Sequence, residues 1–296
     1  MTIDSDSSAA SLSESSVASA ERAVTATRLP SLTNRVYRLD GPGGSVIVRL
    51  AGAGTEQIID RRAELSNHEA AARLGLAPSV LWSAVDAGIM ITPAVADARP
   101  LSEADLQRPG PRSRLATALR RLHGSDAEFE SATDLASELE RYEPLVDVRG
   151  EERGKLRAAL EVGRAAAADL VRDGVPRVPS HNDPTPANAL DDGHEVCLVD
   201  WEYSGANDPA WDLATAIMEG GLKGEAADHF LAEYYGRDPT VAERRRLELH
   251  RVGLDVLAGF WALSRAGAET ESDLRGYAWH RLDRALGGGA PRDGCR

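Results

Sequence analysis

Cysteine is scarce in this chain of 296 residues, which contains only Cys197 and Cys295. The sequence has no CxxC pair and no cluster of cysteine and histidine, so it supports neither a structural zinc site nor a disulfide framework. No apolar run approaches the ~20 residues that a membrane-spanning helix requires, and the N-terminus lacks the basic and apolar regions of a signal peptide. These absences predict a reduced, cytoplasmic protein that has no membrane partner.

Positive charge is also in short supply. The chain has 34 lysines and arginines against 47 aspartates and glutamates, a formal net charge of −13. This balance argues against nucleic acid as the main partner and suits a cationic small molecule, although acidity that serves solubility alone would look the same. Hydrophobic residues make up 42% of the chain, a globular share that allows one large or two modest domains.

The most informative motif is an H-x-D-x-x-x-x-N pattern made by His181, Asp183 and Asn188. Asp200 follows twelve residues after Asn188, at the end of an apolar run (196–199) that predicts a short buried strand. Phosphoryl transfer from a nucleotide needs a carboxylate that orients the attacking hydroxyl and accepts its proton. It also needs an amide oxygen and a second carboxylate that hold magnesium against the phosphates. Asp183, Asn188 and Asp200 supply these three groups, with the Asp-to-Asn spacing of the kinase catalytic loop.

At these residues the chain resembles a known family. HNDPTPAN followed by LVDWEYSGANDPAWDLA is similar to the choline/ethanolamine kinase branch of the aminoglycoside phosphotransferase superfamily, and the resemblance extends over roughly residues 29–266. It implies a bilobal α+β fold like that of the protein kinases, with a small N-terminal lobe of antiparallel sheet and one helix. The larger C-terminal lobe would be mostly helical. ATP and Mg²⁺ are the cofactors that the resemblance implies.

The resemblance also assigns roles within the catalytic loop. It implies that Asp183 is the catalytic base and that Asn188 and Asp200 bind magnesium. His181 would support the loop by hydrogen bonding and take no part in proton transfer. Asp212 corresponds to a family aspartate that buttresses the loop.

Composition and periodicity divide the chain into three parts. Residues 1–25 are rich in serine and alanine and predict a flexible tail, whose later part, Val17–Arg28, could form a marginal helix. Residues 26–97 alternate short strands with one helix and predict the N-terminal nucleotide-binding lobe. Residues 98–296 predict the mostly helical C-terminal catalytic and substrate-binding lobe, in which Asp208, followed by proline, marks a helix start.

Two short stretches of the N-terminal lobe correspond to parts of the family's nucleotide site. SLTNRVYRL resembles the loop that covers the nucleotide, and its candidate binding residues are Ser31, Thr33 and Asn34. The stretch TPAV corresponds to the hinge between the lobes, where the backbone of Thr92 and Ala94 would bind adenine. A turn motif without a run of glycines is a weak signal by itself.

A charged pair is expected between a strand and the helix of this lobe. The turn cluster Gly41–Gly44 predicts a hairpin, and its second strand carries Arg49 where the family usually has lysine. Glu64 lies fourteen residues before Pro78, which matches the family's spacing for the glutamate that orients this cation, and Glu69 is the fallback. An outward-facing strand residue and a solvated helix face are the simpler interpretations of Arg49 and of either glutamate.

The acceptor side gives a thinner signal. In choline kinases a carboxylate and an aromatic box hold the ammonium group, and the matching residues here are Glu219 and Trp261 beside the catalytic Asp183. The companion tryptophan expected three residues before Trp261 is replaced by Ala258. Trp261 is equally well explained as a core residue on an apolar helix face.

Three functions therefore remain in order of preference. The first is an ATP-dependent kinase that phosphorylates the hydroxyl of choline, ethanolamine or a related amino alcohol. The second keeps the chemistry and changes the acceptor to an aminoglycoside or another hydroxylated antibiotic or metabolite. The third is an inactive nucleotide-binding scaffold. The sequence leaves the oligomeric state open between monomer and homodimer.

Overall fold

The computed structural model describes residues 24–31, 33–52, 54–55, 58–266 and 271–287. These residues form two compact units. One contains the described residues up to Gly52 together with Leu81–Ala94, and the other contains those of 53–80 and 95–296. Of the expected N-terminal tail, residues 1–23 lie outside the described part of the chain.

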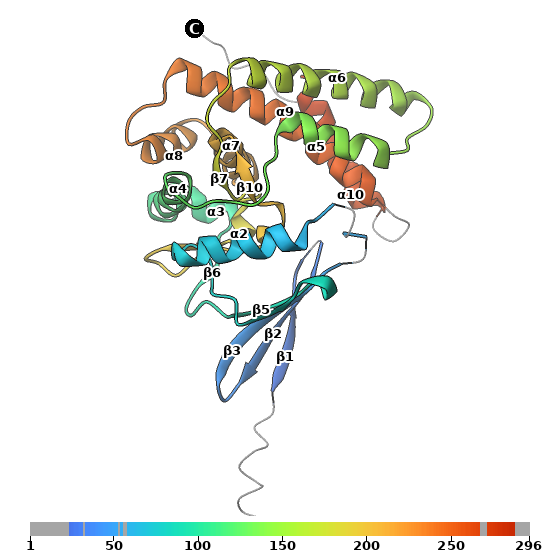
Figure 1. The fold of residues 1–296 in the computed structure, drawn as a ribbon. Coiled ribbons are helices and arrows are strands. Elements are labelled where there is room, and N and C mark those ends of the chain that lie inside the picture. Colours follow the sequence, from blue (N-terminus) through green and yellow to red (C-terminus); the bar gives the residue numbers. More distant parts are fainter. Residues whose placement is uncertain (1–23, 32, 53, 56–57, 267–270, 288–296) are drawn as a thin grey trace, which may run out of the picture. The chain divides into compact units, whose positions relative to one another are not determined.

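The first unit is an antiparallel sheet of five strands in the order β1-β2-β3-β5-β4 (Figure 1). The strands are β1 (Thr25–Leu29), β2 (Arg35–Gly41), β3 (Gly44–Leu50), β4 (Trp82–Ala84) and β5 (Ile89–Pro93), and a 3₁₀ turn, η1 (Val85–Ala87), lies between the last two. The hairpin expected at Gly41–Gly44 is confirmed, since Gly41 pairs with Gly44 across the turn. Another turn requires glycine at position 88, because φ is +62° and a Cβ there would lie 2.4 Å from Cβ of Ala51.

The prediction of a helix at Val17–Arg28 is wrong for residues 25–28, which the structure describes as a strand. Residues from Thr25 onward belong to strand β1, where Thr25 pairs with Asp40 and Thr27 with Arg38. The edge of β2 offers a full ladder of backbone hydrogen bonds to this segment, and its β-branched threonines suit a strand better than a helix. Tertiary pairing thus decides the conformation of a segment whose local helix signal is weak.

The second unit is mostly helical, with two small sheets. Its helices are α2 (Arg61–Arg73), α3 (Glu103–Leu106), α4 (Pro109–His123), α5 (Leu135–Tyr142), α6 (Glu151–Arg172), α7 (Pro209–Glu219), α8 (Glu225–Tyr235), α9 (Val241–Arg265) and α10 (Glu271–Ala285). Its strands β6 (Arg99–Pro100), β8 (Ala189–Asp191) and β9 (Val196–Leu198) form one sheet, and β7 (Val178–Ser180) and β10 (Gly205–Asn207) form the other. The 3₁₀ segments are η2 (Glu143–Leu145), η3 (Pro186–Asn188) and η4 (Trp201–Tyr203). The expected pairing of an antiparallel sheet with a mostly helical remainder is confirmed.

Helix α2, which was expected in the N-terminal lobe, belongs to the larger unit. Its buried residue Asn67 donates to the backbone carbonyl of Ser204 at 3.1 Å, and His68 packs edge-to-face on Trp201. These contacts with the segment after β9 explain why α2 belongs to the helical unit although the strands on either side of it in sequence belong to the sheet.

Helix α7 joins two hydrophobic cores of the larger unit. Leu213 and Ile217 pack in a core with residues of α4 and α8, while Trp211 and Ala214 pack in a second core with α5, α6, α9 and α10. Asp208 begins α7 as predicted, since its carboxylate accepts from the backbone N–H of Ala210 at 2.9 Å and proline follows it. A helix that is apolar on nearly all sides is buried on nearly all sides.

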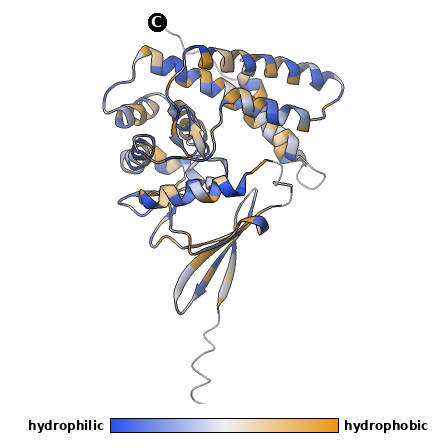
Figure 2. Cartoon of the chain, viewed as in Figure 1, coloured by the Kyte–Doolittle hydropathy of each residue, from blue (hydrophilic) through white to orange (hydrophobic). Residues whose placement is uncertain are grey.

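Helices α6 and α9 have a different pattern. α6 and α9 carry both hydrophobic and hydrophilic residues along their length (Figure 2), and the buried residues of α6 recur at helical spacing. Within the part of the chain that the structure describes, no helix combines the length and the apolar character needed to cross a membrane.

Candidate active site

The loop after β7 brings Asp183 and Asn188 into direct contact. The amide nitrogen of Asn188 donates to the Asp183 carboxylate at 2.8 Å and to the Asp183 backbone carbonyl at 3.0 Å. Because the amide NH₂ faces Asp183, its Oδ1 atom is the acceptor that a metal ion would use. The two motif residues therefore form one unit, with the carboxylate fixed beside the amide.

The residue before Asp183 adopts a backbone conformation that is uncommon outside glycine. Asn182 has φ of 65°, and its two backbone groups bond to side chains on α7. Its N–H donates to Asp212 at 2.7 Å, and its carbonyl accepts from the indole N–H of Trp211 at 2.9 Å. Its side-chain amide donates to the backbone carbonyl of Tyr203 at 2.8 Å and accepts from Asn207 at 2.9 Å. Four bonds thus hold a conformation that costs roughly 1 kcal/mol or more by itself.

Asp212 supports the same loop from the first turn of α7. It is fully buried, and its carboxylate accepts from the backbone N–H of His181 at 2.9 Å as well as from that of Asn182. His123 of α4 donates to it at 2.9 Å and lies 2.8 Å from the hydroxyl of Tyr234. The prediction that Asp212 buttresses the catalytic loop is confirmed by these contacts.

His181 connects the loop to the strand end that precedes Asp200. Its Nε2–H donates to the backbone carbonyl of Val199 at 3.0 Å, and its Nδ1 accepts from the backbone N–H of Asp183 at 3.3 Å. Burial lowers the pKa of His181 to about 4, so the ring is neutral near pH 7. The centroid of this neutral ring lies 4.5 Å from the ring centroid of Trp201. With one donor and one acceptor, both used in hydrogen bonds to the backbone, His181 has the contacts of a residue that supports the loop.

Several carboxylates converge on Asp183. Desolvation by the surrounding protein raises the pKa of Asp183 well above its usual range, and the nearby carboxylates of Asp200, Glu219 and Glu202 raise it further, while the hydrogen bond from Asn188 opposes the shift. Asp200 has a left-handed backbone, with φ of 64°, directly before η4. A cation placed among these groups would relieve their mutual repulsion.

The predicted ligands fit magnesium. Among the described residues, no group of three or more histidine, cysteine, aspartate and glutamate side chains is arranged as a metal site. Magnesium differs from metals that need such a cage, because it takes one or two carboxylates and completes its shell with water and substrate phosphates. Asn188 and Asp200 would supply two of its oxygen ligands.

Six predicted nucleotide-binding residues lie in the smaller unit: Ser31, Thr33, Asn34, Arg49, Thr92 and Ala94. The backbone N–H of Asn34 donates to the hydroxyl of Ser31 at 3.2 Å, which closes a local turn between β1 and β2. Arg49 lies on β3, and Thr92 lies on the neighbouring strand β5. Whether these residues bind a nucleotide stays a prediction.

Glu64 and its fallback Glu69 lie on different faces of α2. Glu64 is buried and accepts from Arg61 at 2.9 Å, whereas Glu69 is exposed. The same guanidinium nitrogen of Arg61 donates to Glu202 at 3.2 Å. Arg61 and Glu202 were not selected from the sequence, although the i,i+3 spacing of Arg61 and Glu64 is a readable signal. The expected pairing of Glu64 with Arg49 stays a prediction.

Glu219, at the end of α7, forms an ion pair with Arg281 of α10. Arg281 is only 5% exposed and also donates to Asp255 and to the hydroxyl of Tyr277. No pattern in the sequence points to this arginine, which lies 62 residues beyond Glu219. Glu219 is therefore already paired with a cation of the protein, in addition to its proximity to Asp183.

Trp261 belongs to a group of aromatic side chains that includes Tyr203. Its indole N–H donates to the hydroxyl of Tyr203 at 3.2 Å, and the buried Tyr142 lies close enough to Tyr203 to affect its pKa. The guanidinium of Arg265 lies 5.9 Å from the Trp261 ring. Tyr142 and Tyr203 thus place aromatic side chains near Trp261, in a chain where position 258 is alanine.

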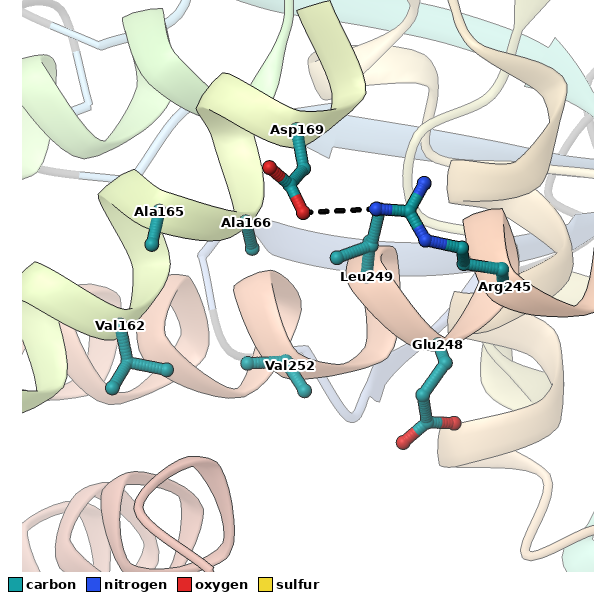
Figure 3. A pocket seen from close by; sticks show the side chains of 8 residues that line it. All are labelled: Val162, Ala165, Ala166, Asp169, Arg245, Glu248, Leu249 and Val252. Atoms are coloured by element: carbon teal, nitrogen blue, oxygen red, sulfur yellow. Dashed lines mark hydrogen bonds and ion pairs between the residues drawn. The ribbon is translucent and has the colours of Figure 1, made fainter. Parts of the chain in front are cut away.

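A cavity of about 310 Å³ lies elsewhere, between α6 and α9 (Figure 3). It is lined by Val162, Ala165, Ala166, Asp169, Arg245, Glu248, Leu249 and Val252. An ion pair of 3.0 Å between Asp169 and Arg245 crosses it, and none of the predicted site residues is among its lining residues. This hollow is separate from the chemistry of the catalytic loop.

A loop and a fold of this kind define a phosphotransferase. The chain belongs to the phosphotransferase enzyme family, whose model matches residues 25–250. It is similar to the protein LicA of Haemophilus influenzae, with 29% identity over 86% of this chain and 77% of that protein.

Two solved structures extend the comparison. A choline/ethanolamine kinase family protein from Mesorhizobium loti is 32% identical, with a TM-score of 0.76 over 90% of this chain and 89% of that chain. The choline kinase LicA from Streptococcus pneumoniae is 25% identical, with a TM-score of 0.78 over 93% and 96%. The expected superfamily, its kinase-like fold and the enzyme class are confirmed.

Proposed function

We propose that this protein transfers the γ-phosphoryl group of ATP to the hydroxyl of choline, ethanolamine or a related amino alcohol. The observation that carries the proposal is the fixed pair of Asp183 and Asn188, with Asp200 beside them. The names of the similar proteins, which include a probable ethanolamine kinase and a probable choline kinase, support the acceptor class. A structure of LicA in complex with AMP, 25% identical to this chain, supports an adenine nucleotide.

The proposed reaction uses few protein groups. The acceptor oxygen attacks the γ-phosphorus, the bond to the β-phosphate oxygen breaks, and ADP leaves with the electron pair. Asp183 orients the acceptor hydroxyl and takes its proton. Asn188 and Asp200 would hold Mg²⁺, which neutralises charge on the phosphates when it is bound.

The acceptor side offers surfaces of two kinds. Tyr203 and Trp261 present aromatic rings, which attract a quaternary ammonium that has no N–H to donate. Glu202 and Glu219 lie close enough to raise the pKa of Asp183, so an acceptor cation bound near Asp183 would feel both negative charges. This combination favours a compact cationic alcohol.

One observation favours the second candidate, phosphorylation of an antibiotic or another hydroxylated metabolite. Arg281 pairs with Glu219 and offsets part of the charge that a cationic acceptor would use. A site with weaker negative charge would also accept a neutral alcohol. The macrolide and spectinomycin phosphotransferases share the fold, with TM-scores of 0.61.

The test is magnesium-dependent ADP release by the purified protein. Choline, ethanolamine, other amino alcohols and a set of antibiotics are offered one at a time, with the Asp183→Asn variant as the blank. Turnover with an amino alcohol at sub-millimolar half-saturation is expected. Turnover with an antibiotic alone would replace the first candidate by the second. ATP binding without stimulation by any acceptor would count against both.

A further inference from the structure

One face of α2 is directed at the segment that follows Asp200. Arg61, Glu64, Asn67 and His68 recur at the spacing of a single helix face, and all four lie against residues of the larger unit. The side chain of Arg61 is 12% exposed, and the other three residues are buried. Arg62, one position further along, is exposed.

Arg61 joins two acidic residues from distant parts of the sequence. Its Nη1 donates to Glu64 at 2.9 Å and to Glu202 at 3.2 Å, and its Nη2 donates to Thr55 at 2.9 Å. The carboxyl side chains of Glu64 and Glu202 are 2% and 1% exposed. Buried carboxylates are stable only with a counter-charge or hydrogen bonds, so the shared guanidinium fixes their positions relative to each other.

Asn67 provides a second connection two residues beyond Glu202. It is fully buried, and its amide nitrogen lies 3.1 Å from the backbone carbonyl and 3.2 Å from the hydroxyl of Ser204. Its carbonyl oxygen accepts from the backbone N–H of Glu130 at 2.9 Å. Between these two connections lies Tyr203, whose backbone carbonyl accepts from Asn182 of the catalytic loop. The segment after Asp200 is therefore held by α2 and by the catalytic loop together.

We propose that Arg61 is a positioning residue that couples Glu64 on α2 to the turn presenting Asp200. Asp200 has a left-handed backbone immediately before η4, so the direction of its carboxylate depends on where η4 lies. Arg61 sets that place through Glu202. This inference rests on the proposed magnesium role of Asp200, whereas the contacts of Arg61 do not depend on that role.

The experiment compares Arg61→Met with Arg62→Met, the same substitution at the exposed neighbouring position. Hydrogen exchange of the Ser204 amide, which donates to the carbonyl of Trp201 at 3.0 Å, is measured on the full chain without nucleotide or metal. Arg61→Met is expected to accelerate this exchange at least tenfold. It is also expected to lower kcat at least tenfold and to raise the half-saturating Mg²⁺ concentration, with the acceptor KM changed less than threefold. Arg62→Met should leave all four quantities unchanged.

A second pair of variants serves if Arg61→Met does not fold. Arg61→Lys keeps a cation next to both carboxylates but loses the fork of donors. In the otherwise unchanged chain, Arg61→Lys is expected to change Ser204 exchange and kcat at least threefold. In a chain that already carries Glu202→Gln, most of this effect should disappear. Equal effects in both backgrounds would show that Arg61 does not act through Glu202 and would overturn the proposal.

The readouts separate this inference from the proposed function. Hydrogen exchange is independent of the reaction, so an exchange effect in a protein that phosphorylates no tested acceptor would refute only the proposed function. Wild-type turnover together with exchange and kcat values that are the same in Arg61→Met and Arg62→Met would refute only the positioning role.

Discussion

The catalytic loop and the proposed acceptor side of the site are built in different ways. Backbone groups of the loop bond to side chains of α7 about thirty residues later, as in the bond from His181 to Asp212. The acceptor side joins elements twice as far apart, since Tyr203 and Trp261 are separated by 58 residues and Glu219 and Arg281 by 62. The backbone of the loop is thus held mainly by α7, with support from α2 and α4, while the surface that would select the acceptor depends on α9 and α10.

This difference explains what the sequence could predict. The residues of the motif, the helix start at Asp208 and the strand before Asp200 are encoded by neighbouring residues, and the structure contains them. Arg281 and Tyr142 carry no local signal, because an arginine or tyrosine on an amphipathic helix is ordinary until its partner is known. Long-range partners of this kind are therefore not predictable from the sequence alone.

Asn182 is an intermediate case. It lies inside the recognised motif, but the motif gives it no chemistry. The residue type indicates only a conformation, because asparagine tolerates the left-handed region of backbone angles better than most other non-glycine residues. Four hydrogen bonds hold the left-handed backbone at position 182, two of them with side chains of α7, and local sequence does not reveal these partners.

The largest expected effect comes from the catalytic loop. Asp183→Asn removes the group that would accept the proton, so kcat should fall by roughly 10²–10⁴-fold, the usual range for a general base. ATP binding, measured by calorimetry, should change little. Asp147→Asn, at an exposed position, is the matched control and should keep full activity. A rate for Asp183→Asn close to that of the control would remove Asp183 from its role.

The loop should also respond to pH through His181. Because burial lowers its folded-state pKa from 6.5 to about 4, the unfolded chain takes up the proton first as the pH falls. Stability should therefore decrease from pH 6.5 to pH 4, by up to about 3 kcal/mol from this group. Urea unfolding across this window measures the slope. His181→Gln should lose this part of the slope, and His194→Gln, at an exposed position, should retain it.

On the acceptor side, Arg281→Met tests whether the ion pair weakens the attraction for cations. Glu219 would lose its counter-ion, while Asp255 would keep Arg284. The KM for a cationic acceptor should fall about three- to tenfold, on the order of 1 kcal/mol, with kcat nearly unchanged. Arg284→Met, which removes a cation that pairs with Asp255, is the control. A raised KM would mean that the pair holds Glu219 in its binding position.

The smallest effect is expected outside the site. Thr240 caps α9, accepting from the backbone N–H of Glu243 at 3.2 Å in a capping box. Thr240→Ala should lower the free energy of unfolding by about 1 kcal/mol, measured by urea unfolding, and leave kcat and KM as they are. Serine at this position should restore the stability. A clear change in acceptor KM would mean that the position of α9 is tuned from its far end.

Helix α7 has a consequence for how such an enzyme can change its substrate. Asp212 in its first turn and Glu219 at its last residue are seven positions apart, which fixes them about 10 Å apart along one rigid axis. Inserting or deleting a single residue between them would turn Glu219 by about 100° relative to the loop. The length of α7 is thus constrained from both ends. Side chains on α9 and α10, such as Trp261 and Arg281, can be exchanged without changing that spacing.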